Sequence, residues 1–142
     1  MKIILIHGPN LNLLGSREPD KYGHETAESL LAHLKTQFTN CQIDYFQSNH
    51  EGELIDAIQK AKHTYSGILI NAGGLSHTSI SMVDALRSIA LPAINIHITN
   101  IYSREEYRHS DPIGDACSGS IIGLGTDGYQ LAMECLLDQI IK

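Results

Sequence analysis

Residues 67–90 read GILINAGGLSHTSISMVDALRSIA, and this stretch decides the fold class. Its first five residues are almost entirely apolar, as expected for a strand buried on both faces of a parallel sheet. A loop with two glycines follows at 72–77. Apolar residues then recur at helical spacing up to about Ala90, at Met82, Val83, Leu86 and Ile89. A buried strand followed by an amphipathic helix is typical of an α/β protein.

The same alternation continues through the 142 residues. Apolar runs predict further strands at 2–7, 42–47, 93–98 and 120–123. Periodic segments predict helices at 26–38 and 49–62 and from 126 onward, with Thr26 and Asn49 as N-caps, and a single helical turn near 103–107. We therefore expect one domain over 1–142, an α/β three-layer sandwich with a flavodoxin-like five-stranded parallel sheet of order 2-1-3-4-5.

Composition narrows the class of protein. Net charge is −6 with histidine neutral, and the basic residues are dispersed, which argues against a nucleic-acid partner. No apolar run approaches the length of a membrane span, and the run at 3–6 is too short for the core of a signal peptide. Three cysteines without CxxC spacing are typical of reduced thiols, so we expect a cytoplasmic protein.

Two familiar sequence motifs occur in the chain, but their position or their residues do not fit the function that each usually indicates. GLGTDG at 123–128 matches a dinucleotide-binding pattern, but such a motif belongs after the first strand. GLSHT at 74–78 lacks the last glycine of a nucleophile elbow. No spacing fits a metal site, and five histidines are expected singly on loops or solvent faces: His24, His33, His50, His63 and His109.

The remaining polar residues converge on one edge of the predicted sheet. In this fold a ligand binds at the carboxyl ends of the strands, near the switch point between the first and third strands. The loops there carry Asn10, Arg17, Tyr22, Asn71, His77, His97, Arg104 and Arg108. Asp84 lies beside the apolar stripe of the third helix, where Arg87 is its one nearby partner. This set suits proton abstraction and loss of water from a polyhydroxylated carboxylic acid.

Five motifs in order give the chain a resemblance to a known family. They are GPNLNLLG (8–15), REPDKYG (17–23), NAGGLSHTS (71–79), HITNIYSREEYRHS (97–110) and GLGTDGY (123–129). Together they resemble type II 3-dehydroquinate dehydratase. The resemblance implies a cofactor-free lyase that converts 3-dehydroquinate reversibly to 3-dehydroshikimate through an enolate. It also implies a homododecamer of four trimers.

The resemblance also implies a role for each matching residue. Tyr22 is similar to the base that removes the proton alpha to the ketone, and Arg17 to the residue that activates it. Asn10 matches the amide that holds the enolate oxygen through a water, and His97 the acid that protonates the leaving hydroxyl. The implied substrate contacts are Asn71, His77, Ile98, Thr99 and Arg108, with Asp84 arriving from a neighbouring subunit.

Three positions depart from the family's pattern. His7 stands where the family usually has Asn, and Thr99 where it has Ser. Asn95 stands two residues before His97, where the family commonly has Glu. We expect Asn95 to orient the imidazole without supplying charge, which predicts slower dehydration or a lower pKa for the acid; the pH–rate profile of Asn95→Glu is the test.

Two other readings stay open at this point. A flavodoxin-like module for flavin or nucleotide would be yellow or retain nucleotide on purification. An oligomeric scaffold would tolerate Tyr22→Phe. Under the lyase reading, residues 8–15 place Asn10 and residues 17–22 form a lid that carries the base.

Overall fold

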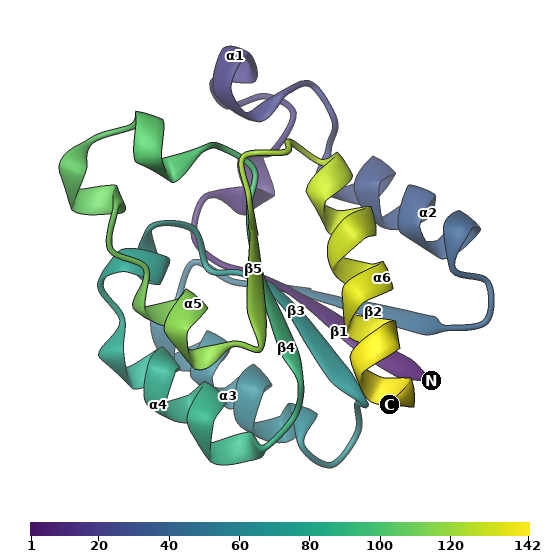
Figure 1. Ribbon diagram of the computed structural model, residues 1–142. Helices are drawn as coiled ribbons and strands as arrows, with labels where there is room; N and C mark the ends of the chain where they lie inside the picture. Colours follow the sequence, from purple (N-terminus) through teal and green to yellow (C-terminus); the bar gives the residue numbers. More distant parts are fainter.

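The structure, a computed structural model, describes residues 1–142 as a parallel five-stranded sheet between two helical layers (Figure 1). The strands are β1 Lys2–His7, β2 Gln42–Gln47, β3 Gly67–Asn71, β4 Ala93–His97 and β5 Gly119–Ile122. All neighbours pair in parallel in the order β2-β1-β3-β4-β5, which confirms the predicted order.

Helices cover both faces of the sheet (Figure 1). The α-helices are α1 Pro19–Tyr22, α2 Ala27–Gln37, α3 Glu51–Ala61, α4 Ile80–Ile89, α5 Pro112–Ala116 and α6 Asp127–Ile141. Four 3₁₀ turns lie in the loops: η1 Leu11–Leu13, η2 Gly73–His77, η3 Ile101–Ser103 and η4 Glu106–Arg108. No helix combines the length and the apolar composition needed to cross a membrane.

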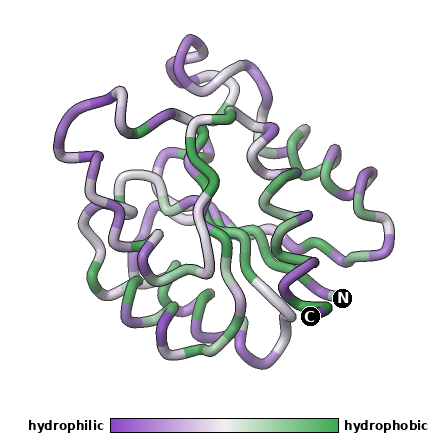
Figure 2. The backbone as a smooth tube through the Cα atoms, in the orientation of Figure 1, coloured by the Kyte–Doolittle hydropathy of each residue, from purple (hydrophilic) through white to green (hydrophobic).

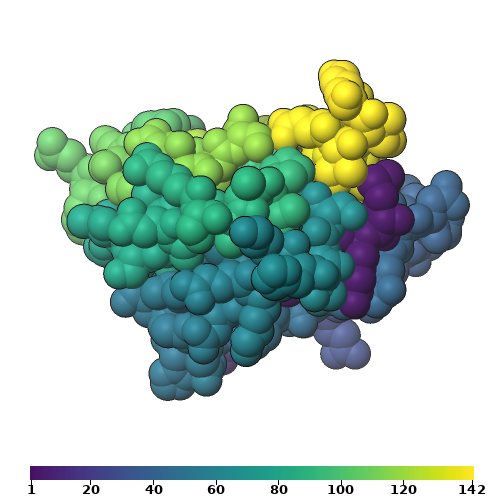
Figure 3. All heavy atoms as spheres, turned by 90° about the horizontal axis from the view of Figure 1, so that it is seen from below, coloured from purple at the N-terminus to yellow at the C-terminus, as the bar shows by residue number.

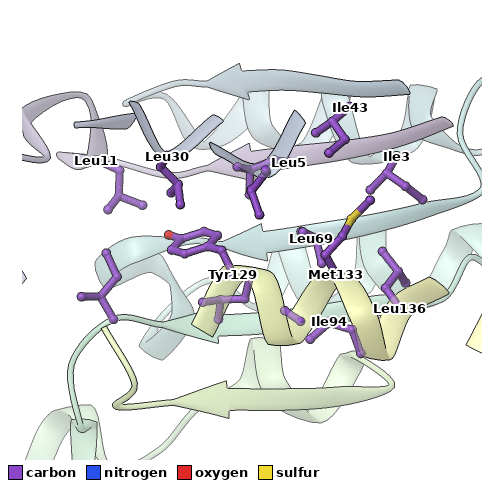
Figure 4. Close-up of a cluster of buried hydrophobic side chains, with 14 of the residues drawn as sticks. Ile3, Leu5, Leu11, Leu30, Ile43, Leu69, Ile94, Tyr129, Met133 and Leu136 are labelled. Carbon is purple, nitrogen blue, oxygen red and sulfur yellow. The ribbon is translucent and has the colours of Figure 1, made fainter. Parts of the chain in front are cut away.

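The core consists of two apolar clusters, one on each face of the sheet. Side chains alternate along β1, so Ile3 and Leu5 join the cluster under α2 and α6 (Figure 4), while Ile4 and Ile6 join the one under α3 and α4. The central strands β1, β3 and β4 are accordingly among the most hydrophobic segments, and the loops at their carboxyl ends are largely hydrophilic (Figure 2). Function is therefore expected in these loops rather than in the core.

The two ends of the chain lie together, at the opposite edge of the sheet from these loops. Figure 1 places the N- and C-termini side by side, and the view from below in Figure 3 shows the end of α6 against the first residues. The loops after β1, β3 and β4 therefore gather at an edge that neither terminus approaches.

The ends of two helices test the predicted caps. Thr26 caps α2 as predicted: its hydroxyl accepts from the backbone N–H of Ser29, and the Ser29 hydroxyl accepts in return from that of Thr26. Asn49 does not cap α3, which begins after His50. Its Oδ1 instead accepts from the backbone N–H of Asn10 at 3.0 Å, and so ties down the loop after β1.

The segment between β4 and β5 holds more structure than predicted. The single turn expected near 103–107 is two 3₁₀ turns, η3 and η4, on either side of Arg104. The short helix α5 was not predicted. Asp111 caps it through Oδ1, which accepts from the backbone N–H of Gly114 at 3.2 Å, and Pro112 occupies its first position.

Gly8 allows the loops after β1 and β3 to touch through their backbones. Its N–H donates to the carbonyl oxygen of Asn71 at 2.8 Å. A Cβ atom built on Gly8 would lie 2.3 Å from the carbonyl oxygen of Ala72, far inside van der Waals contact. Because that neighbour is backbone, a side chain at position 8 forces the two loops apart.

We expect Gly8→Ala to lower the free energy of unfolding by about 2 kcal/mol, a typical cost of overpacking. Gly52→Ala is the matched control, because a Cβ there meets no atom within 4 Å and alanine favours the helix by roughly 0.5 kcal/mol. Urea unfolding of both variants measures the difference. Equal stabilities for the two would contradict the close approach at Gly8.

Candidate active site

The loops after β1, β3 and β4 enclose one pocket at the carboxyl ends of these strands. Its empty space, counted out to the open solvent at its mouth, is about 570 Å³, and only four of its fifteen lining residues are hydrophobic. Nine of the ten predicted site residues lie in its wall: Asn10, Arg17, Tyr22, Asn71, His77, His97, Ile98, Thr99 and Arg108. The pocket suits a small polar ligand.

Tyr22 ends α1 and lies between two guanidinium groups. Nη1 of Arg104 donates to the Tyr22 hydroxyl at 2.9 Å and to Oγ1 of Thr99 at 3.2 Å. The guanidinium carbon of Arg17 lies 5.2 Å from the centroid of the tyrosine ring, within cation–π distance. Arg104 is thus placed to stabilise negative charge on the tyrosine oxygen, and Arg17 adds a second positive charge beside the ring.

Two carboxylates at the rim hold the arginines in place. Nε of Arg17 lies 3.4 Å from Glu18, and Nε of Arg108 lies 2.9 Å from Glu105. The pKa of Glu105 is below its ordinary value, because its own backbone N–H, then Arg108 and Arg104, stabilise the carboxylate. Both acids are more exposed than the arginines they bind, so the pocket itself presents mainly positive charge.

His97 lies at the end of β4 and is paired with a buried carboxylate. Its Nε2 lies 2.8 Å from Oδ2 of Asp111, whose side chain is 10% exposed. Asn95 makes no hydrogen bond with the ring: its Nδ2 donates to the same Oδ2 at 2.7 Å and to Oγ of Ser120 at 3.1 Å. The expectation that Asn95 orients the imidazole directly was therefore wrong. Asn95 supplies no charge, as expected, and the charge beside the ring comes from Asp111.

The surroundings of Asp111 favour its charged form. Burial raises its pKa, but hydrogen bonds from His97, from the backbone N–H of Gly114 and from Asn95 outweigh that effect, so the pKa lies below its ordinary value. A carboxylate at this position places negative charge directly against the imidazole.

His77 and Asn71 have part of their hydrogen-bonding capacity satisfied within the chain. The His77 ring stacks on that of His97 with centroids 5.7 Å apart, and its Nδ1 lies 2.7 Å from the carbonyl oxygen of Ser110. A carbonyl only accepts, so Nδ1 carries the hydrogen and Nε2 is left for a ligand. Nδ2 of Asn71 donates one hydrogen to the Tyr129 hydroxyl at 2.8 Å, which leaves its second.

His7 is buried next to Tyr129, the residue that binds Asn71 of the pocket wall. Its Nδ1 lies 3.1 Å from the Tyr45 hydroxyl, and its ring packs edge-on against Tyr129 with centroids 5.4 Å apart. Burial lowers the pKa of His7 to about 3 and raises that of Tyr45 to about 12, so both are neutral near pH 7. His7 therefore supports the site as a neutral group.

Comparison with known proteins assigns the chain to a family. Residues 1–137 match the family model described as dehydroquinase class II. The chain belongs to this family. Similar proteins include the 3-dehydroquinate dehydratases of Bacillus subtilis, 48% identical over 96% of this chain and 93% of that protein, and of Halothermothrix orenii, 47% identical over 99% and 97%.

The fold agrees with that of solved dehydroquinases. The crystal structure of type II dehydroquinase from Butyrivibrio crossotus matches with a TM-score of 0.94 and 42% identity, over 96% of this chain and 97% of that one. The type II dehydroquinase from Propionibacterium acnes matches with a TM-score of 0.92 and 35% identity, over 96% of each chain. Membership of the dehydroquinase family does not favour the alternative of a flavin- or nucleotide-binding module.

Asp84 is the one predicted site residue that lies outside the dehydroquinase pocket. It is exposed on α4, and Arg87, its expected partner, forms no ion pair with it. Its placement by a neighbouring subunit therefore stays a prediction.

Two residues have a larger place in the site than the sequence indicated. Arg104 was expected among the polar residues of these loops but with no role of its own, and the structure places it on the Tyr22 hydroxyl. In the sequence, Asp111 has only the pattern of a helix cap before a proline. Its contact with His97 could not be predicted, because the two residues are 14 positions apart and meet only in the folded chain. No group of three or more His, Cys, Asp or Glu side chains is placed to hold a metal ion.

Proposed function

We propose that this chain is a 3-dehydroquinate dehydratase: a lyase that reversibly removes water in trans from 3-dehydroquinate to give 3-dehydroshikimate through an enolate. The reaction belongs to the shikimate pathway, in aromatic amino acid biosynthesis, or to quinate catabolism. One observation carries the proposal: Tyr22, bound by Arg104 and flanked by Arg17, shares a polar pocket with His97, which is backed by Asp111.

Tyr22 is proposed as the base. As a phenolate it takes the proton alpha to the substrate's ketone, and the electrons of that C–H bond move onto the carbonyl oxygen. The cations at Arg17 and Arg104 offset the charge of the phenolate before the transfer. Asn10, at the wall of the same pocket, holds the enolate oxygen through a water.

His97 is proposed as the acid. The enolate collapses to a conjugated enone as the carbon–oxygen bond of the neighbouring hydroxyl breaks. The imidazolium of His97 protonates that oxygen, which leaves as water, so the proton lost by His97 balances the one gained by Tyr22. Solvent exchange restores both groups for the next turnover.

The remaining wall residues are proposed to position the substrate. Arg108 holds ring hydroxyls, and Asn71 and His77 offer the hydrogen-bonding groups that the chain leaves free. Backbone groups of Ile98 and Thr99 complete the set, and Asp84 arrives from a neighbouring subunit. The reaction as written uses protein groups and water, and no cofactor.

The proposed oligomeric state and cellular location follow from the family resemblance. We propose that residues 1–142 act as one catalytic domain in a homododecamer of four trimers in the cytoplasm. The partner in each active site is the small molecule 3-dehydroquinate.

The purified protein is expected to convert 3-dehydroquinate to a product that absorbs as a conjugated enone, without added metal or cofactor. A continuous absorbance assay measures this directly, with heat-denatured protein as the control. A folded protein that gave no enone signal would contradict the proposed function, and a yellow protein with bound flavin would favour a binding module.

A further inference from the structure

One carboxylate oxygen in this structure serves two side chains of β4. Oδ2 of Asp111 lies 2.8 Å from Nε2 of His97 and accepts from Nδ2 of Asn95 at 2.7 Å. We infer that Asp111 is the positioning residue of the dehydration: it fixes the imidazole of His97 and stabilises its protonated form, while Asn95 holds Asp111. This inference rests on the proposed function, because it assigns the acid of that reaction its partner.

The two oxygens of Asp111 have separate tasks. Oδ1 caps α5 by accepting from the backbone N–H of Gly114, so the carboxylate plane is fixed by its own helix. Oδ2 then points at β4, where His97 and Asn95 supply the donors. A cap alone needs one oxygen and could face solvent, whereas both oxygens of this side chain are bound.

The atoms around the Asp111 carboxylate are closely packed, and no side-chain carbon would fit at position 114 beside it. A Cβ on Gly114 would lie 2.8 Å from Oδ2 of Asp111 and 3.2 Å from Nδ2 of Asn95, so glycine at this position allows the close approach. Oδ1 of Asn95 is buried without a partner, while its Nδ2 faces Asp111 and Ser120. The amide of Asn95 is thus oriented by the acceptors in front of it.

The chemistry of the acid step needs this arrangement. A carboxylate accepts only, so Nε2 of His97 carries a hydrogen in both protonation states of the ring. The other nitrogen, Nδ1, makes no hydrogen bond within the chain, and His97 lines the pocket. Nδ1 is therefore the atom that gives its proton to the leaving hydroxyl. Negative charge behind the ring favours the imidazolium that must be present before this transfer.

Other charged and titratable groups also act on this pair. His77 stacks on the His97 ring from η2, and Arg17, Arg104, Arg108 and Tyr22 lie in the wall of the same pocket. Cys117, at the end of α5, has its pKa raised to about 12 by burial and by Asp111, and so stays neutral. Among these neighbours, Asp111 is the one carboxylate in contact with the ring.

The test compares Asp111→Asn with Asp115→Asn. Asparagine remains a good helix cap, so Asp111→Asn removes the charge and largely keeps the cap. Asp115 is an exposed acid on the same short helix, and its replacement changes net charge equally. Three quantities are measured for each variant: kcat and KM for 3-dehydroquinate against pH, and the pH titration of the His97 ring by NMR.

For Asp111→Asn we expect kcat to fall about 10- to 100-fold, part of the contribution of general acid catalysis, with KM within about threefold of the parent. The alkaline limb of the kcat profile and the midpoint of the ring titration should both move to lower pH, because the carboxylate beside the ring is lost. The double variant Asn95→Glu/Asp111→Asn, which returns a carboxylate from β4, should recover at least about tenfold in kcat.

A parental kcat and ring titration in Asp111→Asn would overturn the inference, as would a loss of kcat with an unmoved titration. Nitrogen chemical shifts of the parent protein give a test that needs no variant: the neutral ring should carry its hydrogen on Nε2, and a hydrogen on Nδ1 would overturn the pairing. If the parent showed no turnover, the proposed function would fail while the titration and the tautomer still tested Asp111.

Discussion

Replacing Tyr22 with phenylalanine is expected to lower kcat for 3-dehydroquinate by about 1,000-fold, within the range that general base catalysis contributes. The change removes one oxygen, which is both the proposed proton acceptor and the atom that Arg104 binds at 2.9 Å. The ring itself packs against the core and lies beside Arg17, and phenylalanine preserves both contacts. KM should therefore change by less than about fivefold.

Tyr102→Phe is the matched control, because Tyr102 is also in a loop at this edge of the sheet but is 61% exposed and outside the pocket. Its kcat should equal that of the parent. Steady-state assays of both variants, with circular dichroism to establish folding, decide the matter. Substantial turnover by folded Tyr22→Phe would rule out this tyrosine as the base.

The second large effect concerns acid stability and His7. Its pKa is about 3 in the folded protein because of burial, against 6.5 in an exposed histidine. Between these two pH values the unfolded chain binds a proton that the folded protein does not, so stability falls as pH falls. The slope is about 1.36 kcal/mol per pH unit, which amounts to about 3 kcal/mol between pH 6.5 and pH 4.

His7→Asn, which replaces the titratable ring with a neutral amide, should remove this part of the pH dependence. Urea unfolding at pH 7 and pH 4 measures it: the parent should lose about 3 kcal/mol more than the variant between the two conditions. His63 is exposed and makes no side-chain hydrogen bond, so His63→Asn should lose as much as the parent. Equal losses in the parent and in His7→Asn would show that His7 is charged in the folded protein.

Most of the fold could be predicted because its central strands are apolar and its longer helices are periodic. β2 and β3 lie at the predicted residues, and β4 and β5 differ by one residue at their ends. These elements are defined by burial, which leaves a pattern in the sequence. The helices α1 and α5 have four and five residues, too few for a helical period to be visible.

The site was predictable in its membership but less so in its contacts. Loop position at the carboxyl ends of β1, β3 and β4 was enough to place most of the residues in one pocket. Which partners meet inside the pocket depends on tertiary structure. Asn49 has the composition of a helix cap but binds the loop after β1, and Asp111 is a cap whose second oxygen reaches a strand. Contacts of this kind join residues far apart in the sequence, so the local sequence pattern does not predict them.

The shared oxygen of Asp111 also constrains how this site could have changed during evolution. Positions 95 and 111 supply one charge between them and are joined by a hydrogen bond. The effects of substitutions at the two positions on kcat are therefore not expected to be additive. A carboxylate at position 95 beside Asp111 would give two adjacent carboxylates, whereas uncharged residues at both positions would give none. Two would share a proton rather than both ionise, whereas none would leave His97 unsupported. We therefore expect positions 95 and 111 to tolerate substitution only as a pair.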